Sequence, residues 1–153
     1  MVEKSVAGSG TLGPVELNLV TLPDGAAAPD VIAALVQQVR AGVIRVVDFV
    51  TVKKTDSGVV EIQELELDAG GLEDLNVELV VPGLTSNEDI DLLAADLEPG
   101  AAAAIVAFEL VWARDLAHRL AASGAEVVAV ERIPATIVNE IVAMDEAELQ
   151  TGE

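Results

Sequence analysis

The sequence predicts an α+β fold in which the strands of one sheet are connected by amphipathic helices. Three observations support this prediction: strand and helix patterns alternate along most of the chain, Gly and Pro mark the boundaries between them, and two strand patterns are apolar on both faces. The length of 153 residues fits a single domain. A hydrophobic content of 52% excludes a disordered chain, although the formal net charge is −19.

Five segments have the pattern of strands. The first alternates, with Leu17 and Leu19 on one face and Glu16 and Asn18 on the other. In the second, the alternation places Ile44, Val46, Val50 and Val52 on one face and Val43, Val47 and Phe49 on the other. The third changes phase, which indicates a bulge near Gln63-Glu64. The expected strands are residues 15–22, 43–52, 59–67, 101–110 and 126–133.

Four segments have the pattern of helices. Ser86 with Asp89 three residues later approximates a capping box, which marks the start of the second helix. Gly42 and Gly124 end the first and third helices, and Pro134 begins the fourth. The expected helices are residues 29–41, 86–98, 112–123 and 134–148.

In this order, the elements form two β-α-β units. Right-handed crossovers would place the principal helices on one face of a single sheet, which is a ferredoxin-like sandwich with an extra strand, an inserted middle helix and a C-terminal helix. We therefore expect a flexible arm at residues 1–13, one ferredoxin-like domain at 14–148 and a frayed tail at 149–153. An acidic insertion with its own helix occupies residues 68–98 of that domain.

Composition excludes several classes of function. The chain has no cysteine, so it forms no disulfide and holds no thiolate-ligated metal or cluster. An acidic protein without a basic stripe is a poor partner for nucleic acid. The longest apolar run, residues 101–108, is far shorter than a membrane span, and the N-terminus has no apolar signal segment. We expect a cytoplasmic protein with no cofactor and no direct membrane insertion.

No residue pattern specifies a reaction. His118 falls on a polar helix face, and the GxGxxG match at residues 8–13 precedes a strand instead of opening a helix. Fourteen acids and no basic residue lie between Lys54 and Arg114, and we interpret them as a solvated acidic flank. A weak cation site on Asp89 and Asp91, or on Glu73 and Asp74, is the alternative. We expect no catalytic residues, no metal ligands and no enzyme activity.

The two strands that are apolar on both faces lead to a prediction about assembly. In a two-layer sandwich the sheet face opposite the helices is wet and its strands alternate, so a further layer must cover these strands. The terminal helix, the acidic middle segment or another copy of the chain could do so. Arg45 and Asp48 interrupt the second strand, and each must reach solvent, a partner chain or an ion pair. Arg132, which is next to Glu131 in the fifth strand, could be such a partner. The candidate interface residues are Arg45, Val47, Asp48, Phe49, Phe108, Trp112 and Arg132.

Parts of the sequence resemble a known family. The stretches are GPVELNLVTLP (13–23), IRVVDFVTVKK (44–54) and residues 89–134, which include EPG (98–100), WAR (112–114) and ERIP (131–134). They resemble small uncharacterised bacterial proteins, best known from actinobacteria and classified as a domain of unknown function. More distant relatives resemble ferredoxin-like proteins with a glycine-rich membrane-associated hairpin. An acidic segment with Gly70-Gly71 stands at that place here, which favours a soluble form.

The resemblance covers about residues 13–140 and implies a ferredoxin-like fold, but no activity, cofactor or catalytic residue. We therefore expect a non-enzymatic interaction or assembly protein, a homo-oligomer that associates through an apolar sheet face or edge, with a protein partner as a further expectation. The alternative is a regulatory module that binds a small molecule or a cation at an interface between protomers.

Overall fold

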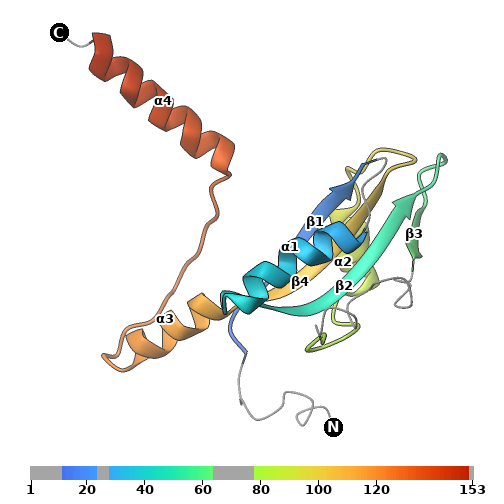
Figure 1. Cartoon of the computed structure of the whole chain (residues 1–153), viewed down its shortest axis with the longest axis horizontal. Coiled ribbons are helices and arrows are strands. Elements are labelled where there is room, and N and C mark those ends of the chain that lie inside the picture. Colours follow the sequence, from blue (N-terminus) through green and yellow to red (C-terminus); the bar gives the residue numbers. More distant parts are fainter. Residues whose placement is uncertain (1–11, 24–27, 64–77, 152–153) are drawn as a thin grey trace. The chain divides into compact units, whose positions relative to one another are not determined.

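A computed structural model of the chain describes residues 12–23, 28–63 and 78–151 (Figure 1). The chain divides into two compact units, residues 1–119 and 120–153. This boundary lies inside the region 14–148 for which the sequence predicts one domain.

The described residues form an α+β structure, as the sequence predicts. Its elements agree with most of the expected ones to within a few residues, and the second helix is shorter than expected. The strands are β1 (Val15–Leu22), β2 (Ile44–Lys54), β3 (Val60–Gln63) and β4 (Ala102–Leu110). The helices are α1 (Ala28–Arg40), α2 (Asn87–Leu93), α3 (Val111–Ala121) and α4 (Ala135–Thr151). The bulge expected near Gln63-Glu64 lies at the limit of the described residues, because Glu64 is outside them.

The four strands form one antiparallel sheet in the order β1-β4-β2-β3. Since β1 and β2 are both antiparallel to β4, they run in the same direction with β4 between them (Figure 1). The first strand and helix thus form a β-α-β unit that is split by the later strand. Within the described residues, β1 is one edge of the sheet and β3 is the other.

The expected fifth strand is not formed. Residues 125–134 belong to no helix or strand. The reason is that β propensity alone does not make a strand, because the ladder needs hydrogen bonds to a neighbouring strand. The α+β prediction is therefore confirmed, whereas the second β-α-β unit is absent from this structure.

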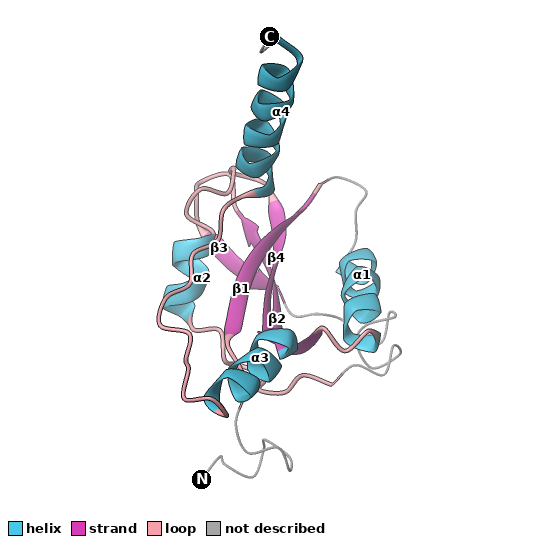
Figure 2. Ribbon diagram, turned by 90° about the vertical axis from the view of Figure 1, so that its left-hand side faces the viewer, coloured by secondary structure: helices cyan, strands magenta, loops and turns pink. Residues whose placement is uncertain are grey.

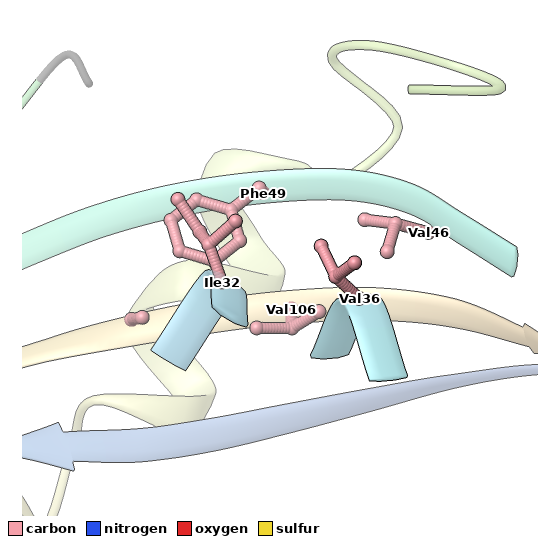
Figure 3. Packing of buried hydrophobic residues seen from close by; sticks show 6 residues of the cluster. Ile32, Val36, Val46, Phe49 and Val106 are labelled. Atoms are coloured by element: carbon pink, nitrogen blue, oxygen red, sulfur yellow. The ribbon is translucent and has the colours of Figure 1, made fainter. Parts of the chain in front are cut away.

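One face of the sheet packs against α1. Ile32 and Val36 of this helix contact Val46 and Phe49 of β2 and Val106 of β4 (Figure 3). The helical spacing of four residues between Ile32 and Val36 puts both side chains on the same side of α1. Ala104 completes the buried cluster, and its small side chain lets the helix approach the sheet closely.

The opposite face of the sheet is covered by α2 and the residues that follow it. Ile90 and Leu97 pack against Val52, Ala103 and Ile105. Figure 2 shows α1 and α2 on opposite sides of the strands. The two helices α1 and α2 of this unit therefore lie on opposite faces. Of the three possible covers that the sequence leaves open for the second face, the acidic middle segment is the one observed, because it brings apolar residues of its own. This layer explains why β2 and β4 are apolar on both faces.

A β-bulge in β2 changes which side chains share a face. The register with β4 shifts between Val46 and Asp48, which leaves Val47 as the additional residue. As a result Val46 joins Phe49 in the cluster under α1, while Val50 and Val52 belong to the cluster under α2. The regular alternation that the sequence predicts for this strand is wrong beyond the bulge.

Candidate functional site

The most unusual polar group of the sheet is the carboxylate of Glu109 near the end of β4. Its side chain has an exposed fraction of 0%. The alternation along β4 puts Glu109 on the same face as Ala107 and Ile105, both of which are also buried. A buried carboxylate needs charged or hydrogen-bonding partners, because burial without them is costly.

Two arginines and one backbone amide surround this carboxylate, and together these residues form the Glu109 cluster. Arg45 is the cross-strand neighbour of Glu109, and its Nη1 lies 3.5 Å from Oε1. Arg114 in the first turn of α3 places its Nη1 3.2 Å from Oε2. The N–H of Gly13 donates a hydrogen bond of 2.6 Å to the same oxygen. The cluster therefore ties the start of β1, the start of β2 and the start of α3 to the end of β4.

Gly13 is a residue that the geometry of the Glu109 cluster requires. A Cβ at this position would lie 2.6 Å from the Cβ of Arg114 and 3.2 Å from its Cα. Real Cβ atoms do not approach other carbons so closely, so a side chain here would displace α3 or the segment before β1. The last glycine of the GxGxxG match thus serves the contact with Arg114, and residues 8–11 of that match lie outside the described residues.

The Glu109 cluster is suited to structure and not to catalysis. A general base must reach a substrate, whereas Glu109 is enclosed and accepts from Gly13 and Arg114. The side chains of the two arginines are partly exposed, with fractions of 38% for Arg45 and 22% for Arg114, and they connect the buried charge to the surface. We infer that the cluster fixes the point at which the chain leaves the sheet and enters α3.

A second buried carboxylate, Asp48, holds the loop that leads to α2. Its Oδ1 accepts the N–H of Gly83 at 3.1 Å, and its Oδ2 accepts the N–H of Thr85 at 2.8 Å. Beside it, the N–H groups of Val80 and Val81 donate to the carbonyls of Val46 and Val47 at the bulge. Asp48 therefore anchors the covering layer of the second sheet face to β2.

The structure places the seven candidate interface residues in three different settings. Val47, Asp48 and Phe49 are buried in the chain's own interior, and Phe108 is partly buried beside the cluster under α1. Arg45 pairs with Glu109 of the neighbouring strand. Trp112 and Arg132 are exposed, Trp112 with a fraction of 55%.

Glu109 is the residue that sequence reasoning missed. The sequence pattern places Glu109 among the fourteen acids of the solvated flank, yet its side chain is fully buried. A signal was present, because a lone acid at the end of a strand that is apolar on both faces needs the same explanation as Arg45 and Asp48. Two charged residues of opposite sign in two such strands indicate a cross-strand pair.

The acidic residues proposed for a cation site have other settings in the structure. The Asp89 carboxylate accepts the N–H of Ser86, and the Ser86 hydroxyl accepts the N–H of Asp89, which confirms the capping box. Glu73 and Asp74 lie outside the described residues. In the described ranges, no group of three or more His, Asp or Glu side chains is placed to hold a metal ion. His118 is exposed, as the sequence predicts.

The second unit has many exposed apolar side chains. None of the residues 121–150 is buried or half-buried. Two of the valines in the segment before α4 are among the most exposed side chains, Val128 with a fraction of 84% and Val130 with 86%. We call the following set the C-terminal apolar surface: Val127, Val128, Val130, Ile133, Ile137, Val138, Ile141 and Val142.

On α4 the apolar residues form a stripe. Ile137, Val138, Ile141 and Val142 recur at spacings of one, three and four residues, which is the pattern of a helix that packs against another element. Among the described helices, none has both the length and the apolar content to cross a membrane. The four residues of the stripe are exposed in the second unit.

Comparisons with known proteins assign a family. The model of the family of unknown function DUF6325 matches residues 11–151. Because this match spans most of the chain, the chain belongs to that family, and the resemblance to a domain of unknown function is confirmed. Searches of the curated proteins and of the solved structures found no match.

Proposed function

We propose that this chain, a member of that family of unknown function, is a non-enzymatic assembly protein that associates with itself. The observation that carries this proposal is the C-terminal apolar surface. Isolated exposed apolar residues are ordinary, but eight within sixteen positions of one segment are typical of an interaction surface. Burying them against a partner removes apolar area from water, which favours association.

The sheet edge supports the same proposal. Both faces of the sheet are covered by α1 and α2, so the association we expect uses the edge and not a face. An edge strand offers unsatisfied backbone groups to another chain, and proteins protect long edges with Pro, Lys or a bulge. β1 is eight residues long and contains none of these. It is therefore an edge that favours pairing.

The acidity of the chain fits an assembly of limited size. A net charge of −19 repels further copies at long range and keeps the protein in solution. Apolar contact at short range then supplies the attraction between copies. The net charge thus acts between copies at long range, and the apolar residues act between them at short range.

The test is the mass of the protein in solution, measured by analytical ultracentrifugation over a range of concentrations. We expect an oligomer at micromolar concentration that dissociates on dilution. Val128→Asp should dissociate it, because a charge replaces an apolar side chain in the C-terminal apolar surface. Leu92→Asp is the matched control, since Leu92 is an apolar residue of α2 with an exposed fraction of 76%. A monomer at all concentrations would refute the proposal.

A further inference from the structure

The hydrogen-bond pattern of β1 shows which backbone groups its outer edge presents. The N–H of Leu110 donates to the carbonyl of Pro14 at 2.8 Å, so positions 14 and 110 form a hydrogen-bonded pair. Antiparallel ladders alternate, so the even-numbered residues of β1 bond to β4. The N–H and C=O groups of the odd-numbered residues therefore point to the outer edge. These residues are Val15, Leu17, Leu19 and Thr21.

A segment suited to that edge lies in the same chain. Residues 126–133 contain four β-branched residues and neither Gly nor Pro, which is the composition of a strand. They form no helix or strand, and Val127, Val128, Val130 and Ile133 are exposed. The segment has the same length as β1, which has eight residues.

We propose that residues 126–133 of one copy pair with the outer edge of β1 in a second copy, and that the exchange is reciprocal. The added strand extends the order to β3-β2-β4-β1-(126–133), which is a ferredoxin-like arrangement with β3 as the extra strand. Each copy then supplies the strand that pairs with β1 of the other copy. In a two-fold dimer both β1 strands are therefore paired on both sides. This inference rests on the proposed function and names the partner and the contact.

The start of α3 explains why the segment comes from a second copy. α3 follows β4 directly, and none of its residues is buried, so it does not return across a face of the sheet. Eleven helical residues extend about 16 Å. A strand of eight residues extends about 26 Å. If the chain turned back directly after α3, the segment would run against β4 and so parallel to β1, and it would reach only the first residues of β1. A second copy related by a two-fold axis perpendicular to the strands can present the segment antiparallel.

The antiparallel register with full overlap is also favourable for the side chains. It places Arg132 opposite Glu16, a pair of opposite charge, and Val128 opposite Val20. Parallel full overlap would place Val127 opposite Glu16 and Arg132 opposite Thr21. The antiparallel register therefore makes a specific prediction about which residues meet.

Engineered cysteines test this register, because the natural chain has none. In Val20→Cys/Val128→Cys we expect a disulfide-linked dimer on a non-reducing denaturing gel. Neither single variant should form it alone, but a mixture of Val20→Cys with a mass-tagged Val128→Cys should form a mixed dimer. An internal disulfide in a monomer would show that the segment pairs within its own chain. A non-covalent dimer without the disulfide would overturn the exchange and leave self-association intact, whereas a monomer would overturn both.

Proline substitution provides a second test that does not depend on the exact register. Val127→Pro/Val128→Pro removes two successive N–H groups, one of which must face β1 in any register. We expect at least a tenfold weaker dimer. Val127→Thr/Val128→Thr keeps both N–H groups and the branched shape, and we expect it to weaken the dimer much less. Equal dissociation constants for the Pro variant and the natural chain would overturn the proposal.

Discussion

Residues 12–119 and residues 120–151 use the same kinds of apolar residue in opposite ways. In the first region, valines, isoleucines and alanines of β2 and β4 are enclosed between α1 and α2. In the second, valines and isoleucines of comparable number are exposed. The contrast shows that one part of the sequence specifies a complete core, whereas the other carries apolar residues that its own unit does not bury.

The contrast also separates two roles of the chain's acids. Glu109 and Asp48 are buried and hold elements of the first unit together. Most of the remaining described acids are exposed. The acidic composition therefore includes two kinds of residue, a buried kind that holds elements together and an exposed kind that charges the surface.

The largest expected effect comes from truncating one isoleucine in each region. Ile105→Ala should lower the free energy of unfolding by about 2–5 kcal/mol, because Ile105 is fully buried in β4. Ile141→Ala should cost less than about 0.5 kcal/mol in dilute protein and more at concentrations at which copies associate. Urea denaturation at two protein concentrations measures both. Equal losses in dilute protein would contradict the contrast between the regions.

The ion pairs of the Glu109 cluster should contribute to the stability of the first region. Glu109→Gln should lower the free energy of unfolding by about 1–3 kcal/mol, because it removes the buried anion that Arg45 and Arg114 share. Glu98→Gln is the control, since Glu98 is an exposed acid of the middle segment. If chemical denaturation gives the same stability for both variants, the cluster does not hold β4 and α3 together.

The glycine beside that cluster should respond to added volume. Gly13→Ala brings a Cβ to 2.6 Å from the Cβ of Arg114, and the required shift should cost about 1–3 kcal/mol. Arg114→Gly removes the obstructing side chain, so the same Ala should cost less in that background. The coupling free energy of this double-mutant cycle, obtained from urea denaturation, checks the contact. Additive losses would mean that Gly13 and Arg114 do not crowd each other.

The smallest expected effect concerns the layer over the second sheet face. Ser86→Ala removes one half of the capping box of α2 and should cost about 1 kcal/mol. Ser86→Asp keeps an oxygen acceptor at the N-cap and should retain most of the stability. Thermal unfolding followed by circular dichroism distinguishes the two variants. Identical midpoints for Ser86→Ala and the natural chain would show that α2 does not depend on its cap.

Local patterns were sufficient to predict most elements of the first unit. The alternation of Val15–Leu22, the capping residues Ser86 and Asp89 and the helix stop at Gly42 are short-range signals that act within one element. The structure confirms the α+β class on this basis. Segments whose conformation depends on neighbours in sequence were therefore the predictable ones.

Features that depend on contacts between distant residues could not be predicted in this way. The bulge at Val47 is fixed by the loop that donates hydrogen bonds to β2 and by Asp48, which anchors that loop from 35 positions away. The segment 126–133 has the composition of a strand, but its partner is not specified by its own residues. The pairing of Arg45 with Glu109 likewise follows from the position of β4 between β1 and β2.

The central claim is that a second copy pairs with the outer edge of β1 in solution. Amide hydrogen exchange measured by NMR tests this claim directly. The N–H groups of Asn18 and Val20 bond to β4 and should be protected at every concentration. Those of Leu17 and Leu19 should be protected in concentrated protein and lose protection on dilution, together with alternate amides of residues 126–133. Rapid exchange at Leu17 and Leu19 at all concentrations would contradict the account.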